Sequence, residues 1–186
     1  SASKTFGGEV VSAGTRLEGL RAAFTTVAGS AQAGARQLAF VRQEAQRLSI
    51  DVDVAQTQFL KLTAASRGTT LQGTETQRLF SAMAGAARVL NLTSDQTQLS
   101  FRALEQIMSK GKLSAEELRQ QLGDHLPGAF QIAARAMGVT TQQLDAMLKK
   151  GQVFSEDFLP KFRRQLELEF SGGVEAASRT AGAAFA

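Results

Sequence analysis

Helix start and stop signals alternate along most of this chain, which limits it to short helices that fold back on one another. Ser or Thr is followed three residues later by Gln or Glu ahead of an apolar-periodic segment at Thr74/Gln77, Thr93/Gln96, Ser114/Glu117 and Thr140/Gln143. In such a capping box each side chain accepts a hydrogen bond from a backbone N–H at the helix start. Residues typical of left-handed helix ends stand at Asn91, Gly111, Gly123, Gly138 and Gly151.

These signals predict seven helices after residue 50. They are expected near residues 54–66, 74–90, 93–110, 114–122, 127–137, 140–150, and from 155 or 159 to 170. The helix from Thr74 shows a buried stripe at Leu79, Met83, Ala86 and Leu90. Strand signals are nearly absent, so we expect an all-α fold, with a compact multi-helix domain of short capped helices over residues 50–170.

The first 49 residues follow a different pattern, a heptad seam that predicts a helical arm. Apolar or small residues alternate spacings of four and three from Phe6, Val10 and Ala13 onward, and the seam's larger side chains form a candidate self-association surface: Leu17, Leu20, Phe24, Val27, Leu38, Val41 and Leu48. Glycines weaken this arm, each costing a helix interior about 1 kcal/mol relative to Ala. We expect helices near 9–27 and up to 48 with a weak point at 29–34; the seam's partner could lie in this chain or in another copy.

Charge and the C-terminal tail add two further expectations. Residues 1–50 carry six Lys or Arg against three acidic residues, which is typical of a solvated helix face but could also contact phosphates or an acidic partner. Residues 171–186 are either a small-residue linker or the start of a rod helix. Val174, Ala177, Ala181 and Ala184 continue the seam spacing, which predicts a helix beginning after Gly173.

Composition removes most catalytic chemistry. The chain has no cysteine and a single histidine, which excludes disulfides, thiolate metal sites, cysteine nucleophiles and most other metal sites, so no cofactor is predicted. No apolar segment is long enough to span a bilayer. The carboxylate pairs Glu116/Glu117 and Glu156/Asp157 could be mistaken for glycosidase acids, but they fall in first helical turns, where they meet the helix dipole. We therefore expect no enzyme.

The stretch LGDHLPGAF holds the only histidine, and it is interpreted as a joint between two helices. Gly123 would end one helix and Pro127, with its fixed φ and missing N–H, would begin the next. Asp124 and His125 then fall in the turn. The alternative, an acid–base pair, lacks a serine elbow or a second ligand beside it.

A second constellation has the spacing of a helix-turn-helix. Ala134, Gly138 and Leu144 stand at its small, turn-glycine and apolar positions. The expected recognition helix contains Asp145, and its cations, Lys149 and Lys150, stand only at its far end, so it is poorly equipped to neutralise phosphates. A tight helix corner used for packing is the preferred interpretation, and DNA binding is kept as an alternative.

The chain also repeats itself weakly. The segment KGKLSAEEL, which starts at Lys110, returns forty residues later as KGQVFSEDF, which starts at Lys150. Two copies are too few for a solenoid. Both segments combine a glycine stop with an acidic helix start, and the resemblance is interpreted as two solutions to that same problem.

The segments SKGK, AEELRQQLG, LPGAF, AMGVTT and FLPKF, within residues 109–162, together resemble the conserved domain of phage tail tape-measure proteins. Residues 59–93 are similar to the preceding part of that domain. The positions that carry the resemblance are Lys110, Gly111, Glu116, Glu117, Leu118, Gln121, Leu122, Gly123, Leu126, Pro127, Gly128, Ala129, Phe130, Met137, Gly138, Leu159 and Pro160.

The resemblance implies a structural role in the lumen of a phage or prophage tail. It implies a protein that templates tail-tube polymerisation, sets tail length and leaves at genome ejection. The implied partners are other copies of the chain, the tail-tube protein and tail assembly chaperones, with assembly in the host cytoplasm and no nucleic acid. We expect this chain to be the compact head of a longer protein that continues as a rod beyond Ala186; a non-catalytic part of a tail-associated cell-wall hydrolase is the other alternative.

Overall fold

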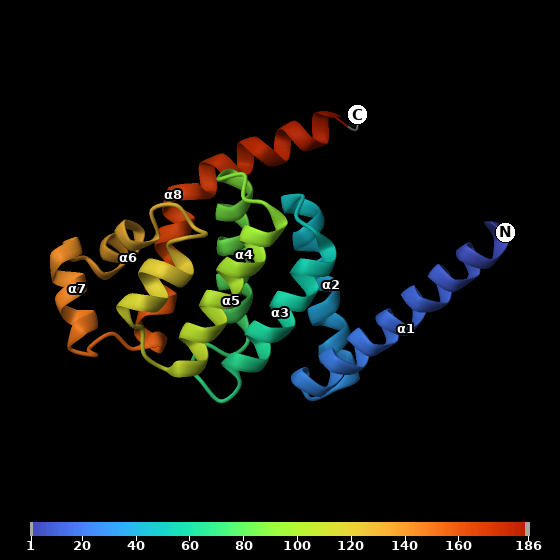
Figure 1. Ribbon diagram of the computed structural model, residues 1–186, viewed down its shortest axis with the longest axis horizontal. Helices are drawn as coiled ribbons and strands as arrows, with labels where there is room; N and C mark the ends of the chain where they lie inside the picture. The colour runs from blue at the N-terminus through green and yellow to red at the C-terminus, as the bar shows by residue number, and fades with distance from the viewer. Residues whose placement is uncertain (1, 185–186) are drawn as a thin grey trace.

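Nine helices joined by short turns make up the part of the chain that the structure describes (Figure 1). This computed structural model describes the backbone of residues 2–184 and the side chains of residues 14–180. The helices are α1 (Ala2–Ala28), α2 (Ala31–Leu48), α3 (Val52–Ser66), α4 (Thr74–Val89), α5 (Ser94–Lys110), the π-helix η1 (Glu117–Leu122), α6 (Ala129–Met137), α7 (Thr141–Lys149) and α8 (Ser155–Ala184). Residues 2–184 contain no β-strand, which confirms the all-α class.

Five phenylalanines, one from each of the first five helices, connect these helices through ring contacts. The ring centroids lie 6.2 Å apart for Phe24 and Phe59, 5.3 Å for Phe40 and Phe59, 5.1 Å for Phe59 and Phe80, and 5.0 Å for Phe80 and Phe101. Aromatic pairs at such distances contribute beyond their area of burial. Helices α1 and α2 therefore share one hydrophobic core with α3, α4 and α5.

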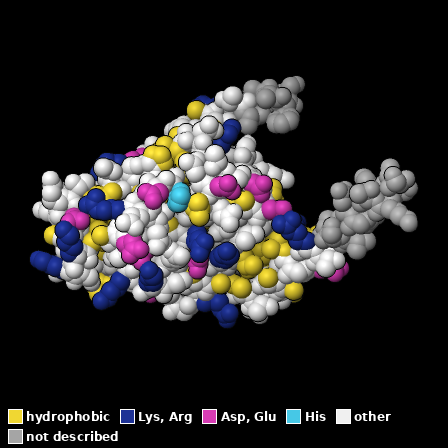
Figure 2. All heavy atoms as spheres, viewed as in Figure 1, with side chains coloured by type: hydrophobic (Ala, Val, Ile, Leu, Met, Phe, Trp, Pro, Cys, Tyr) yellow, Lys and Arg dark blue, Asp and Glu magenta, His cyan; other side chains and the backbone are white. Residues whose placement is uncertain are grey.

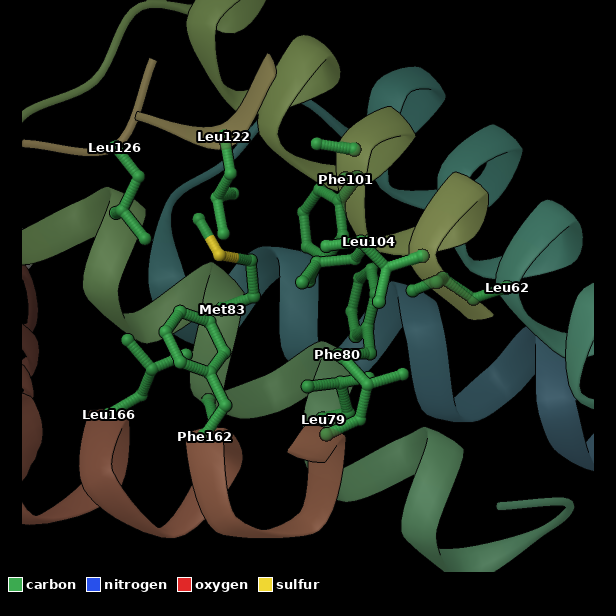
Figure 3. Packing of buried hydrophobic residues seen from close by; sticks show 14 of the residues in the cluster. Leu62, Leu79, Phe80, Met83, Phe101, Leu104, Leu122, Leu126, Phe162 and Leu166 are labelled. Carbon is green, nitrogen blue, oxygen red and sulfur yellow. The ribbon is translucent and has the colours of Figure 1, made fainter. Parts of the chain in front are cut away.

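Helix α4 runs through the centre of this core. Its Leu79 and Met83 are almost fully buried, and Figure 3 shows them between α5 and α8, opposite Phe101 and Phe162. Ala86 is also buried, and Leu90 packs partly buried against the same cluster. The predicted stripe at spacings of four, three and four is thus the face that α4 turns to the core.

Three of the four predicted capping boxes are present. Gln96 N donates to Thr93 Oγ1 at 3.2 Å, Gln143 N to Thr140 Oγ1 at 3.2 Å and Glu117 N to Ser114 Oγ at 3.2 Å, and each pair has the reciprocal bond.

The fourth predicted box, Thr74/Gln77, is wrong. The residue before α4 is Gly73, at φ +85°, and no side chain caps this helix. Thr76 instead donates its hydroxyl to the backbone oxygen of Leu71 at 2.6 Å. The turn ahead of α4 therefore satisfies its polar groups by a different set of bonds.

The predicted helix stops are confirmed at four positions and wrong at one. Asn91, Gly111, Gly138 and Gly151 all have positive φ. Gly123 has φ −66°, and it follows a π-helix rather than the predicted α-helix over 114–122. A Cβ at this position would lie 2.3 Å from the Arg119 backbone oxygen, so glycine is required for space and not for its φ.

The helix predicted to begin at Pro127 begins two residues later, at Ala129. Gly128 has φ +77° and ψ 11°, and Ala129 N donates to Leu126 O at 3.1 Å. Proline followed by a glycine of this geometry is the pattern of a type II turn. Pro127 therefore serves the turn and not the first helical position.

The end predicted at residue 170 is also wrong, because α8 continues through Gly172 and Gly173 to Ala184. Contact with α4 explains this continuity. A Cβ at Gly173 would lie 2.9 Å from Val89 Cγ1, and one at Gly85 would lie 3.0 Å from Val174 Cγ2. These two glycines let α4 and α8 approach closely, and packing keeps the segment helical.

At the N-terminal end, α1 and α2 form a hairpin that crosses at Gly34. The turn lies at Gly29, with φ +84°, and Ser30, whose hydroxyl accepts a hydrogen bond from Ala33 N at 3.1 Å. A Cβ at Gly34 would lie 2.7 Å from Thr25 N, so the two backbones are in direct contact. Beyond this crossing the N-terminal half of α1 extends away from the other helices (Figure 1).

Candidate functional site

The two halves of the sequence repeat lie against each other, in what we call the paired turns, residues 110–114 and 150–155. Lys112 and Phe154 form an isolated antiparallel bridge. Leu113 N donates to Val153 O at 2.9 Å, and Ser155 N donates to Gly111 O at 3.0 Å. The two bonds flank the Lys112/Phe154 pair, so the two copies pair two residues away from the register of the repeat, in which Lys112 corresponds to Gln152. The sequence repeat alone did not reveal that its two copies would lie side by side and antiparallel.

Glu117 fixes the first of the paired turns. Its carboxylate is 3% exposed and accepts hydrogen bonds from Ser114 N at 2.8 Å, from the Ser114 hydroxyl and from the Lys110 ammonium. Burial raises the pKa of Glu117, but the hydrogen bonds from Lys110 and Ser114 outweigh it and hold that pKa below its ordinary value. The Glu117 hydrogen bond and charge raise the pKa of Lys110. Glu117 is thus an ionised helix cap, with its oxygens occupied, rather than a proton donor.

The second turn connects to two other parts of the fold. The Ser155 hydroxyl donates to the backbone oxygen of Ile107 in α5. Glu156 accepts a hydrogen bond from the Thr70 hydroxyl at 2.6 Å, which joins the start of α8 to the loop between α3 and α4. On the outer side Phe154 is 52% exposed, and Lys112 Nζ lies 5.2 Å from the centroid of its ring.

The family-motif residues fall into two stretches of the fold, which meet in η1. Lys110, Gly111, Glu116, Glu117 and Leu118 belong to the first paired turn and the helix it starts, and Leu159 and Pro160 follow the second turn in α8. The remaining positions run through η1 and α6: Gln121, Leu122, Gly123, Leu126, Pro127, Gly128, Ala129, Phe130, Met137 and Gly138. Leu118, Leu122, Leu126, Ala129 and Phe130 are all buried, so most of the apolar motif positions hold the core together.

The joint LGDHLPGAF brings no catalytic group to Asp124 or His125. Both lie in the turn between η1 and α6, with Asp124 exposed and His125 partly buried. His125 borders a shallow groove with Arg102, Gln106 and Gln121, and no carboxylate lines it. The interpretation as a joint therefore fits the observed geometry, although the helix that follows starts later than predicted.

The residues of the helix-turn-helix spacing form a packed corner. Leu144 and Ala134 are buried between α6 and α7. Asp145 binds both Lys149 at 2.7 Å and Arg119 at 3.1 Å, and these two cations lower its pKa. The Arg119 guanidinium also lies 3.8 Å from the centroid of the Phe130 ring. The cation expected to meet phosphate, Lys149, is therefore already paired.

Part of the heptad seam is buried against other helices of the same chain. Phe24, Leu38, Val41 and Leu48 are at most 5% exposed in the shared core. Leu17, Leu20 and Val27 are partly buried, and Leu17 and Leu20 line an open groove between α1 and α3. Figure 2 shows hydrophobic side chains gathered beside the base of α1. Phe6, Val10 and Ala13 lie outside the residues whose side chains are described.

Sequence reasoning missed the ion pairs between distant segments. Arg163, 7% exposed, donates to Glu75 at 2.7 Å and to Glu167 at 2.7 Å. Arg135 binds Glu169 through two hydrogen bonds of 2.7 and 2.8 Å. Only Arg163/Glu167 has the i,i+4 spacing that a sequence can signal. The other pairs connect α8 to α4 and α6 across 88 and 34 positions, for which a single sequence holds no signal.

The described residues contain no group of three or more acidic or histidine side chains placed to hold a metal ion. Among them, no helix combines the length and the apolar character needed to cross a membrane.

Comparison with known proteins gives one consistent result. The model of the family described as "Tape measure protein" matches residues 8–186. A "Probable tape measure protein" of Salmonella phage Felix O1 (isolate Felix O1-VT1) is 34% identical over 174 residues, which cover 92% of this chain and 23% of the relative. The chain thus spans about a quarter of the length of that relative. No solved structure gives a significant match.

Proposed function

Because this chain belongs to the tape measure protein family, and so has a structural role in a phage tail, we propose that it is a compact block within a longer ruler. In this proposal the whole protein templates polymerisation of the tail tube in the lumen, sets tail length, and is released at genome ejection. Assembly in the host cytoplasm, chaperones that coat the protein and association of several copies belong to the same proposal.

The observation that carries the proposal is the fold itself taken with the family match. An extended α-helix rises about 1.5 Å per residue, so a ruler gains length with each residue added. Helices α2 to α7 instead reverse direction at left-handed residues and share one hydrophobic cluster with α8. Residues in such a cluster cannot add length in proportion to their number. We therefore assign the setting of tail length to helical segments of the protein outside this block.

Tail length in assembled particles tests this division of roles. In-frame deletions of whole heptads in the parent gene, outside the region that encodes this chain, should shorten tails by about 1.5 Å per deleted residue. As the matched comparison, deletion of residues 141–149 (α7) should prevent normal assembly or leave tail length unchanged, without proportional shortening. Unchanged tail length after the outside deletions would refute the claim that the length of the protein sets the length of the tail. Proportional shortening after the α7 deletion would refute the claim that this chain is a compact block that adds no length.

Neither alternative function gains support from the site. The paired Lys149 and the neighbouring Asp145 do not suit DNA binding, and the carboxylate of Glu117 is used in capping. DNA affinity that falls steeply with salt and is lost on changing Lys149 and Lys150 to Gln would restore the first alternative. Clearing of a peptidoglycan gel that depends on Glu117 would restore the second.

A further inference from the structure

A shallow groove between α1 and α2 carries positive charge and no carboxylate. Its volume is about 330 Å³, and its walls include Arg21 and Thr25 of α1 with Ala35, Leu38, Ala39 and Arg42 of α2. Acidic residues are absent from its whole lining. The basic excess that the sequence shows in this arm is therefore partly gathered at one place.

The floor of the groove is smooth enough for another helix to approach. Leu38 forms a buried base at 5% exposure, while Ala35 and Ala39 are exposed one helical turn apart. Helices pack with their axes about 8–10 Å apart, and small side chains at the contact allow the shorter distances. An exposed Ala–x–x–x–Ala pair beside a buried leucine suits the apolar face of an incoming helix.

The arginines of the groove are not neutralised. Arg42 donates from Nε to the amide oxygen of Gln56 at 2.9 Å, which leaves its positive charge unpaired, and Arg21 has no ion pair among the described residues. Neighbouring arginines differ, because Arg16 pairs with Asp53 at 3.2 Å and Arg47 pairs with Glu44 at 2.8 Å. Unpaired cations beside an apolar floor match an anionic partner that also carries apolar side chains.

We propose that this groove binds an acidic amphipathic helix of a partner protein. The partner's apolar face covers Ala35 and Ala39, and carboxylates on its flanks meet Arg21 and Arg42. Another copy of the α1–α2 hairpin is a poorer occupant, because it would place its own arginines against these. Binding to this groove does not depend on the tail-length role, since it can be measured in the absence of tail tubes.

Peptide binding to the 186-residue chain tests the proposal. The probes are two fluorescent synthetic helices with the same Leu/Ala heptad face, one flanked by Glu and the other by Lys, and the readout is fluorescence anisotropy at low and high salt. The Glu-flanked helix should bind, with affinity that falls as salt rises. Its affinity should fall at least tenfold in the double variant Arg21→Gln/Arg42→Gln and in Ala39→Glu. Arg164→Gln, an exposed arginine on α8, should leave it unchanged.

Other outcomes would overturn the proposal. Absence of binding or equal binding of the Lys-flanked helix would each contradict it. The same holds for an affinity that is unchanged in the double variant, provided that circular dichroism shows the variants folded. Self-association of the chain that Ala39→Glu abolishes would assign the groove to a second copy instead. In assembling particles, a photo-crosslinker in place of Ala35 should join the chain to an acidic helical peptide of a different protein.

Discussion

The buried carboxylate of Glu117 shows how one residue can hold a turn. It joins the side chain and backbone of Ser114 to Lys110 at the first of the paired turns. A buried carboxylate with full hydrogen bonding is stable, whereas its partners become unsatisfied when it is removed. We expect Glu117→Ala to lower the free energy of unfolding by about 2 kcal/mol. Urea denaturation checks this, and Glu116→Ala, at an exposed neighbour, should change it by less than about 0.5 kcal/mol.

The same carboxylate predicts a dependence of stability on pH. The folded pKa of Glu117 lies below its ordinary value of 4.5, so the unfolded chain binds the proton more readily. The stabilisation is fully present above about pH 4.5 and is lost as pH falls through the lower folded pKa. The difference in Tm between the native chain and Glu117→Gln should therefore shrink on acidification from about pH 6 to about pH 3. A difference that grows over this range would contradict the assignment.

Gly34 and Gly14 allow opposite predictions within one hairpin. A Cβ at Gly34 would lie 2.7 to 2.9 Å from backbone atoms of Phe24 and Thr25, while nothing lies within 4 Å of one at Gly14. Gly34→Ala should destabilise by about 1–3 kcal/mol, because two backbones must separate. Gly14→Ala should stabilise by up to about 1 kcal/mol through helix propensity. The midpoint of urea denaturation measures the effect of each substitution. Equal effects of Gly34→Ala and Gly14→Ala on stability would show that the two backbones are not in close contact at Gly34.

At the scale of elements, the close approach of α4 and α8 replaces the helix break that two adjacent glycines would suggest. A Cβ at Gly173 would meet Val89, whereas one at Gly172 meets nothing within 4 Å. Gly173→Ala should cost about 1 kcal/mol or more, since the β-branched Val89 has little rotamer freedom in a helix. Gly172→Ala should be neutral or stabilising.

A double-mutant cycle separates contact from propensity at this crossing. Val89→Ala removes the two methyl groups that a Cβ at position 173 would meet. The loss caused by Gly173→Ala should therefore be smaller in the Val89→Ala background, with a coupling of about 0.5–3 kcal/mol. Additive effects would mean that α8 and α4 do not restrict each other here.

At the scale of the whole molecule, the phenylalanine contacts predict that α2 and the helices after it unfold together. Phe59 contacts Phe24, Phe40 and Phe80. Phe59→Ala should cost about 3–5 kcal/mol. The chain contains no Trp or Tyr, so single tryptophans at Phe40 and at Phe162 would report separately on α2 and α8. Their unfolding curves should coincide and shift together in Phe59→Ala.

The same measurement tests the division of the chain into an arm (1–49), a helical domain (50–170) and a C-terminal segment (171–186). Two separate transitions would support a domain boundary near residue 49. One common transition would instead place α2 in the same cooperative unit as α3 to α5. The heptad spacing could not show whether α2 belongs to this unit, because a seam of period 3.5 has the same sequence pattern whether its partner helix lies in the same chain or in another copy.

The sequence by itself determined the local features of this protein. Capping boxes at Thr93, Ser114 and Thr140 depend on bonds between residues a few positions apart, so a single sequence contains them. The same holds for the left-handed helix ends at Asn91, Gly111, Gly138 and Gly151. Tertiary contacts decided the features that these local signals did not predict correctly. Contact with α4 keeps Gly173 helical, the Arg119 backbone oxygen requires Gly123, and the bridge between Lys112 and Phe154 joins the repeated turns. The groove between α1 and α2 belongs to the same class, because it exists only once two helices cross at Gly34.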